Sequence, residues 1–478
     1  MEKLTKIIAT IGPSSDSPEK IEELINLGVN IFRFNFKHSD PAWHKERVER
    51  VKEISKRLGK NTATLIDLQG PEIRAYLATD KLELKKDDEI LVSKSADLNS
   101  KNSLYFKPLE VADALQNGQR LVADDGNFLF TVIKKENSIY LKSESEGILL
   151  NKKTINIRNL EINFPVLTEN DEIGIKLAKE LDIDFIALSF VRSADDVEKL
   201  RVKLKELDSN AKIISKIETF KAIQNIDEII LASDAVMIAR GDMGVELSLE
   251  EVPYFQKEII KKCVKNGVPV VTATQMLETM TNSKMPTRAE VSDVSNAVFD
   301  FTDAVMLSGE TAMGAHPADV VKLMVRVVKF SEEKNKIHDI RDLIDYRLAS
   351  ISEMVCDSAF NLYKSLKNKD QEIKGFIVFT HSGKSARIIS RYRMHTPIYA
   401  FCPNDEVARS LGINYGVTSI IQEKIKTEDE VVKEEIQDAI RILKEKNICI
   451  PGDTFVVLHG DYWTSDQGAS TIRIISAN

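Results

Sequence analysis

Apolar stretches of strand length recur along this 478-residue chain, and a helix-like pattern follows each of them. Eight of these stretches share that alternation and lie at 6–12, 31–36, 62–68, 185–190, 212–218, 235–240, 269–274 and 304–309. Near-continuous apolar strands that alternate with helices are typical of a parallel sheet buried on both faces. Eight such units predict a TIM (β/α)8 barrel, with a doubly wound open sheet as the alternative.

The segment between the first two strands shows how the intervening helices are delimited. Ser17 can cap a helix, Pro18 fits its first turn, and Gly28 can close it. The sequence therefore predicts a helix between residues 17 and 28.

The alternation breaks once, between about residues 71 and 156. Short alternating strands such as 81–84 and 127–134 occur there, separated by Gly and Asn-Gly turns. This pattern predicts a small all-β domain inserted after the third barrel strand. A long insertion at that end of a barrel strand lies above the active-site mouth, where it would act as a lid.

After about residue 330 the chain becomes highly charged and then starts a new alternation of strands and helices. Strands are expected at 375–380, 397–401 and 454–458, which predicts a separate C-terminal α/β domain. The predicted domains are a barrel over 1–70 and 157–335, an inserted β lid over 71–156, and a C-terminal α/β regulatory domain over 345–478.

Composition narrows the class of protein. The formal net charge of -8 argues against non-specific nucleic-acid binding. The four cysteines lie far apart with no Cys-x-x-Cys pair, which fits neither a zinc site nor a disulfide framework and indicates a reducing compartment. No stretch approaches the ~18 apolar residues that a membrane helix needs. We therefore expect a cytoplasmic protein with neither a membrane nor a nucleic-acid partner.

The candidate catalytic and metal-binding residues lie at the ends of two predicted strands. Lys216 and Glu218 stand two residues apart on one strand, so both side chains project from the same face. Asp242 follows an Arg-Gly step at the end of the next strand. A cation with two carboxylates suits a metal-assisted reaction on an anionic substrate, because hard divalent ions prefer carboxylate oxygens. From these residues alone, two salt-bridged strand ends remain the alternative.

The chain resembles the pyruvate kinase family almost from end to end. The motifs that carry the resemblance stand in family order: TIGPSS at 10–15, RFNF at 33–36, GPEIR at 70–74, SKIE at 215–218, ARGD at 239–242, TATQMLE at 272–278, PTRAEVSDV at 286–294 and MLSGETA at 306–312. The family also has an eight-fold barrel, an inserted β lid and a C-terminal α/β domain. The resemblance implies phosphoryl transfer from phosphoenolpyruvate to ADP, which gives ATP and pyruvate.

The resemblance also implies roles for the charged residues of these motifs. Glu218 and Asp242 look like the ligands of a divalent ion, Mg²⁺ with Mn²⁺ as the alternative. Lys216 would neutralise charge on the migrating phosphoryl group and on the enolate that it leaves. Arg33 and Arg74 would clamp phosphate oxygens with their planar guanidinium groups.

Further residues are carried over from the family for substrate and nucleotide. Gly241 lacks a side chain, so backbone N–H groups near Gly241 and Asp242 can approach the substrate carboxylate. Thr274 resembles the family's hydroxyl near the enolate, which helps to route the proton to carbon. Residues in nucleotide-binding positions are Asn35, His38, Arg74 and Lys153. The segment around Lys153 departs from the family pattern, so this carry-over is weaker.

One departure concerns the monovalent cation, usually potassium, that many family members need. Asn35 and Asp67 remain, but Lys37 replaces a serine and Leu68 replaces a threonine. A lysine head group has the charge of potassium, so we hypothesise that Lys37 supplies it and that potassium is not required. Glu72 counts against this, since potassium-independent members often carry lysine there. The alternative is that Lys37 points outward and the site is degraded.

The C-terminal domain contains a candidate effector-phosphate loop. Its residues are Thr380, Ser382, Gly383, Lys384 and Ser385. Hydroxyls, a glycine and helix-start N–H groups form a phosphate cradle, and this segment resembles the family's effector loop. A sugar phosphate or nucleotide monophosphate is the expected activator, with residues 460–468 as the facing loop; a helix N-cap without ligand is the alternative. The resemblance also implies a homotetramer.

Two rival functions remain to be weighed. A barrel aldolase or mutase would explain the metal carboxylates and Lys216, but neither the lid nor Lys153. A non-catalytic metabolite sensor would have no need for the complete catalytic set. Ser308 and Glu310 could shape the site or be purely structural. His44, His316 and His338 are expected to be ordinary surface or helix-cap residues.

Overall fold

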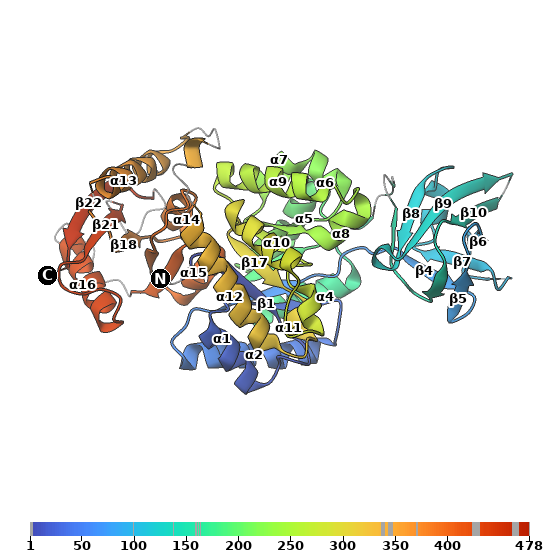
Figure 1. The fold of residues 1–478 in the computed structure, drawn as a ribbon, viewed down its shortest axis with the longest axis horizontal. Coiled ribbons are helices and arrows are strands. Elements are labelled where there is room, and N and C mark those ends of the chain that lie inside the picture. The colour runs from blue at the N-terminus through green and yellow to red at the C-terminus, as the bar shows by residue number, and fades with distance from the viewer. Residues whose placement is uncertain are drawn as a thin grey trace.

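The computed structural model describes residues 3–477 except 99, 137, 158–159, 161, 163, 336–339, 343–347, 370, 423–430 and 461–467. Three regions follow one another along the long axis of the molecule (Figure 1). An all-β domain lies at one end, a barrel lies in the middle, and the C-terminal α/β domain lies at the other end.

The central region is a closed barrel of eight parallel strands in the order β1-β17-β16-β15-β14-β13-β3-β2. Its strands are β1 Lys6–Thr10, β2 Ile31–Asn35, β3 Ala63–Asp67, β13 Phe185–Leu188, β14 Lys212–Ile217, β15 Ala235–Ala239, β16 Val270–Ala273 and β17 Ala304–Leu307. The predicted barrel is confirmed, and the open-sheet alternative is wrong. Each strand ends one or two residues earlier than predicted, because the chain turns out of the sheet there; Arg240, for example, begins helix α8.

Helices surround the barrel in the predicted alternation. They are α1 Pro18–Leu27, α2 Pro41–Arg57, α4 Glu169–Glu180, α5 Ala194–Glu206, α6 Phe220–Gln224, α7 Ile226–Ala232, α8 Arg240–Glu246, α9 Val252–Asn266, α10 Arg288–Phe299, α11 Gly309–Ala312 and α12 Pro317–Lys334. Ser17 caps α1 by accepting from the Lys20 amide, and Gly28 closes it at φ 104°. None of the described helices is both long and apolar enough to span a membrane.

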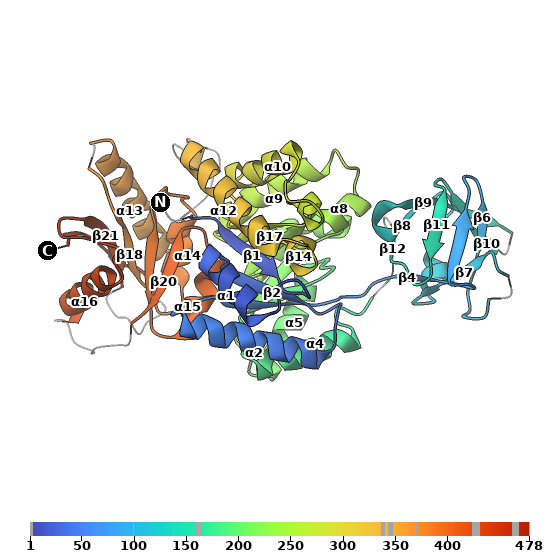
Figure 2. The ribbon, with the colours of Figure 1, turned by 60° about the horizontal axis from the view of Figure 1, so that its bottom comes forward.

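The inserted domain lies between β3 and α4 and extends away from the barrel in both views (Figures 1 and 2). Its elements are β4 Arg74–Leu77, β5 Lys81–Leu84, β6 Glu89–Ser93, β7 Ser103–Lys107, α3 Val111–Ala114, β8 Arg120–Ala123, η1 Asp124–Gly126, β9 Phe128–Lys135, β10 Ser138–Ser143, β11 Gly147–Leu150 and β12 Ile155–Ile157. A separate apolar core holds its two sheets together. We call this domain the lid; its predicted limits, like those of the other domains, stay predictions.

The C-terminal domain is a five-stranded sheet in the order β20-β19-β18-β21-β22. Its elements are α13 Ile351–Lys367, β18 Gly375–Phe379, α14 Lys384–Ser390, β19 Ile398–Cys402, α15 Asp405–Ser410, η4 Leu411–Ile413, β20 Val417–Ile421, α16 Val431–Glu445, β21 Thr454–His459 and β22 Thr471–Ser476. The sequence pattern missed β20 and β22. Both are edge strands with half-exposed side chains, so they lack the continuous apolar run of the inner strands.

Two buried ion pairs join the C-terminal domain to the barrel. Arg393 Nη2 lies 2.6 Å from Asp303 Oδ2, and Arg409 Nε lies 2.7 Å from Asp184 Oδ1. Asp303 directly precedes β17, and Asp184 directly precedes β13. The C-terminal domain therefore binds the amino ends of the barrel strands and leaves their carboxyl ends to form a site.

Candidate active site

Lys216 lies at the carboxyl end of β14 and is the centre of a buried polar cluster. Its Nζ is 2.8 Å from Glu218 Oε1, 3.2 Å from Asp67 Oδ1 and 2.7 Å from Ser189 Oγ. Only 12% of the Lys216 side chain is exposed, and Asp67 and Glu218 are each 1% exposed. Strands β3 and β14 thus direct opposite charges to one point at the barrel mouth, and the strand between them, β13, is followed by the Ser189 hydroxyl.

Arg33, in the middle of β2, extends this cluster on the other side of Asp67. Its Nε donates to Asp67 Oδ2 at 2.7 Å, and its Nη1 donates to Thr10 Oγ1 at 2.9 Å. Both carboxylate oxygens of Asp67, a residue predicted for a monovalent-cation site, therefore face the cations of Arg33 and Lys216. Leu68, predicted at the same site, is buried and offers no side-chain oxygen.

The protonation equilibria follow from burial and from these neighbours. Burial opposes the charge of Lys216, but the carboxylates of Asp67, Glu218 and Asp242 outweigh it and raise the pKa of Lys216. Burial also opposes the charge of Asp67, yet Lys216 and Arg33 hold the pKa of Asp67 below its ordinary value. For Glu218, burial together with the charge of Asp242 raises the pKa to about 7, even though Lys216 acts in the opposite direction.

Glu218 and Asp242 are close enough for the charge of one to disfavour the charge of the other. Lys216 supplies one positive charge to this pair of carboxylates, and a divalent ion would supply further positive charge. Within the described part of the chain, no group of three or more His, Cys, Asp or Glu side chains could hold a metal. Two carboxylates, Glu218 and Asp242, are a donor set for an ion that completes its shell with substrate oxygens and water.

Thr274 follows β16 and lies beside the start of α8. Its hydroxyl accepts from the Gly241 amide at 2.8 Å and donates to the Ala273 carbonyl at 2.7 Å. Thr274 and Gln275 have φ values of 63° and 54°, a left-handed conformation that disfavours residues other than glycine. Arg240 Nη2 stabilises this turn by donating to the carbonyls of Thr274 (2.7 Å) and Gln275 (3.2 Å).

Glu72 joins Lys37 to Arg74 at the entry to the lid. Lys37 Nζ lies 2.5 Å from Glu72 Oε1, and Arg74 Nη2 lies 2.5 Å from Glu72 Oε2. Arg74 also donates to the Lys152 carbonyl, while Asn35 Oδ1 accepts from the Lys37 amide at 3.3 Å. The Glu72 side chain is nearly buried whereas Lys37 is exposed, so this ion pair lies at the edge of the site.

His38, a predicted nucleotide-binding residue, contacts His44 through its backbone carbonyl. The Nε2 atom of His44 lies 2.7 Å from the His38 carbonyl oxygen, and its ring stacks on Phe36 at 5.0 Å between centroids. The expectation that His44 is a surface residue is wrong, because it is buried. His316 occupies the N-cap position of α12, as expected, and His338 lies outside the described residues.

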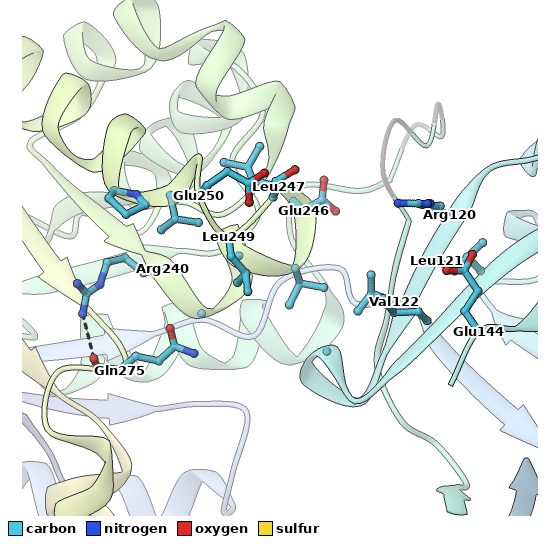
Figure 3. A pocket seen from close by; sticks show the side chains of 18 of the residues that line it. Arg120, Leu121, Val122, Glu144, Arg240, Glu246, Leu247, Leu249, Glu250 and Gln275 are labelled. Carbon is cyan, nitrogen blue, oxygen red and sulfur yellow. Dashed lines mark hydrogen bonds between the residues drawn. The ribbon is translucent and has the colours of Figure 1, made fainter. Parts of the chain in front are cut away.

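A cleft of about 720 Å³ separates the lid from the barrel beside α8. Figure 3 shows Arg120 of the lid across this cleft from Glu246 and Leu249. Lys153 belongs to the lid side, where its Nζ lies 2.5 Å from Asp124 Oδ1. The structure therefore brings Lys216, Glu218, Arg33 and Asp67 together on the barrel, pairs Gly241 with Thr274 there, and places Lys153 on the lid.

The predicted effector loop connects β18 to α14. Gly383 is the N-cap residue of α14 with φ 81°, and Ser382 and Lys384 are exposed. The Ser385 hydroxyl is buried and accepts from the Ala469 amide at 3.0 Å, so it has a structural partner. Thr380 is buried at the start of the loop. Of the predicted facing loop, residues 461–467 lie outside the described part of the chain.

Several residues around the site were missed by sequence reasoning. Ser189 contacts Lys216, the Phe190 amide donates to Glu218 Oε2 at 2.7 Å, and Arg240 holds the Thr274 turn. For Ser189 and Arg240 a usable signal was their position, since each directly follows a barrel strand. Glu310 has a structural role, because its carboxylate accepts from the amides of Ser308 (2.7 Å) and Leu277 (3.2 Å).

Comparisons with known proteins agree with this arrangement. Residues 2–321 match the family model described as pyruvate kinase, barrel domain, and residues 353–475 match pyruvate kinase, alpha/beta domain. A pyruvate kinase of Staphylococcus saprophyticus is 38% identical over 95% of this chain and 77% of its own length. One from Geobacillus stearothermophilus is 37% identical over 96% and 78%. A crystal structure of a pyruvate kinase from Cryptosporidium parvum superimposes with a TM-score of 0.91 at 33% identity, covering 100% of this chain and 96% of the other.

The raised pKa of Glu218 predicts how divalent-ion binding to the substrate-free protein depends on pH. The carboxyl must be ionised to bind metal, so Mn²⁺ affinity should fall about tenfold per pH unit below about 7 and level off above it. Isothermal titration calorimetry between pH 5.5 and 8 measures this slope. Glu218→Gln should bind weakly at every pH with a shallow slope. Wild-type affinity that is constant from pH 5.5 to 7 would contradict the prediction.

Proposed function

The chain belongs to the pyruvate kinase family, and on that premise we propose how its barrel mouth carries out the family's reaction. The protein transfers the phosphoryl group of phosphoenolpyruvate to ADP, and ATP and pyruvate are the products. The observation that supports the proposed roles best is the buried Lys216 ammonium, which lies between Asp67 and Glu218 at the carboxyl ends of β3 and β14.

Lys216 and Arg33 would bind the phosphoryl oxygens. The phosphoryl group in transfer spreads negative charge over its oxygens, and fixed cations in a water-poor site stabilise that charge without reorganisation. Asp67 contacts both cations and orients them. Lys216 would also stabilise the enolate oxygen from which the phosphoryl group departs.

Glu218 and Asp242 would hold the divalent ion that the family generally uses, Mg²⁺ with Mn²⁺ as the alternative. When bound, this ion would supply positive charge that offsets the charge of the phosphoryl and enolate oxygens. The Phe190 amide orients the Glu218 carboxylate toward the site by donating to Oε2.

Thr274 and Gly241 would handle the substrate carboxylate and the proton. After transfer, the enolate carbon must gain a proton to become the methyl group of pyruvate. The Thr274 hydroxyl, held by the Gly241 amide and the Ala273 carbonyl, would bind the carboxylate and help to deliver that proton. Substrate would displace part of this pairing, since the Gly241 amide is also the proposed carboxylate donor.

The nucleotide would bind between the barrel and the lid. Asn35 and His38 would contact it from the barrel, and Arg74 and Lys153 would contact it from the lid, where Arg74 begins β4. Closing of the lid over the cleft would bring the two sides together and exclude water. An aldolase, a mutase or a metabolite sensor would leave this two-sided arrangement without a use.

We further propose that Lys37 takes the place of the monovalent cation. Its ammonium pairs with the nearly buried Glu72 carboxylate, and Asp67 already faces two cations. The apolar Leu68 removes one side-chain oxygen that a potassium ion would need. Glu72 thus fixes the Lys37 ammonium that would replace potassium, whereas potassium-independent members of the family often carry lysine at this position.

A phosphorylated effector would bind the loop from Thr380 to Ser385, with the exposed Ser382 and Lys384 as its first contacts. Ser385 would act indirectly, because its hydroxyl already accepts from Ala469. A homotetramer and a cytoplasmic location stay predictions; light scattering would test the first, and cell fractionation would test the second.

Replacing Lys216 should remove most of the catalysis. We expect Lys216→Met to lower kcat for pyruvate formation by about a hundredfold to a thousandfold, because one preorganised charge is lost from the transition state. A coupled assay that requires both ADP and a divalent ion measures this. Lys212→Met is the matched control, since Lys212 lies at the opposite end of the same strand. Near-wild-type turnover by Lys216→Met would contradict the assigned role.

Potassium should have little effect on the wild-type enzyme. At constant ionic strength, rates in potassium and in tetramethylammonium should agree within about twofold, because Lys37 provides the charge. The double variant Lys37→Ser, Leu68→Thr should instead be activated by potassium, since both oxygen donors return. Strong potassium activation of the wild type would refute the substitution.

Effector binding should alter the response to phosphoenolpyruvate. Sugar phosphates and nucleoside monophosphates, titrated one at a time, should include one that lowers the substrate concentration at half-maximal rate. Lys384→Ala should weaken that effector by about tenfold, because a charge-assisted contact to phosphate is lost. If no compound in the panel changes the substrate curve, the loop is a helix cap only.

A further inference from the structure

The turn directly after β13 contacts both charged residues of the Lys216–Glu218 pair. The Ser189 hydroxyl is buried, accepts from Lys216 Nζ at 2.7 Å and donates to the Leu68 carbonyl at 2.7 Å. A hydroxyl has one proton, so the bond to Leu68 directs the serine lone pairs toward the ammonium. Ser189 therefore fixes the direction from which Lys216 is held.

The next residue fixes the carboxylate. The Phe190 amide donates to Glu218 Oε2 at 2.7 Å, and Phe190 has φ 56°, a left-handed conformation that residues other than glycine rarely adopt. A strained backbone persists only where the surroundings enforce it. Here it aims one amide at Glu218 while the preceding hydroxyl reaches Lys216.

The segment that follows β3 packs against this turn. Gly70 has φ 72°, and a Cβ built there would lie 2.8 Å from the Phe190 ring and 2.9 Å from the Ser189 Cβ. Only glycine allows this approach without a shift of the neighbours. The turn is therefore held both by the Leu68 carbonyl and by close packing against Gly70.

We propose that the Ser189–Phe190 turn positions the catalytic pair, and that Ser189 is a positioning residue for Lys216 in phosphoryl transfer. This inference rests on the proposed role of Lys216. Without the serine hydroxyl, the ammonium is held only by two carboxylates, and it would shift toward them and away from the phosphoryl oxygens. The consequence falls on kcat rather than on substrate binding, because the misplaced charge matters most where negative charge develops.

The test compares Ser189→Ala with Ser215→Ala. Ser215 is the best-matched control, because it is buried beside Lys216 on β14 but pairs with Ser233 Oγ at 2.6 Å. We expect Ser189→Ala to lower kcat by about tenfold or more, with KM for phosphoenolpyruvate changed by less than about threefold. Ser215→Ala should keep wild-type kcat. The melting temperatures of the two variants should agree with each other within about 3 °C.

Each other outcome counts against the inference. A kcat for Ser189→Ala within about twofold of wild type, or an equal loss in Ser215→Ala, overturns it. If Ser189→Ala does not fold, Ser189→Cys, which keeps the volume but accepts hydrogen bonds weakly, is judged by the same criteria. If neither variant folds, the residue is structural and the inference fails. A wild-type protein that forms no pyruvate would instead refute the proposed function itself.

Discussion

The charge alternation Arg33–Asp67–Lys216–Glu218 is the interaction on which the site depends. Each charge lies next to an opposite one, at 2.7, 3.2 and 2.8 Å in turn. An isolated charge buried at this depth would lose its proton or gain one, whereas a paired charge persists. The alternation ends at Glu218, whose raised pKa marks the point where one more positive charge is needed.

The barrel makes this alternation possible at small cost to the fold. Parallel strands bring their carboxyl ends to one rim, so residues distant in sequence meet without any special loop. Asp67, Lys216 and Ser189 come from three adjacent strands. The lid then forms the opposite wall of the cleft. The proposed metal-binding carboxylates lie on the barrel, and Lys153 lies on the lid.

The part of the site that follows from strand periodicity could be predicted. Lys216 and Glu218 share a face because side chains alternate along a strand, and strand order places Asp242 nearby. The Phe190 amide could not be predicted, because its direction depends on a left-handed φ rather than on residue type. His44 was predictable but missed: it belongs to the buried face of α2 with Val48 and Val51, at helical spacing.

The attachment of the C-terminal domain has a mechanical consequence for the barrel. Arg409 forms an ion pair with Asp184, which directly precedes β13. Ser189, which directly follows β13, is only five residues further along the chain. An extended chain of that length measures about 16 Å and resists stretching, since its backbone is paired on both sides. Strand β13 is therefore a short, stiff connection between two sites. Its amino end is preceded by the residue that anchors the C-terminal domain, and its carboxyl end is followed by the serine that contacts the lysine.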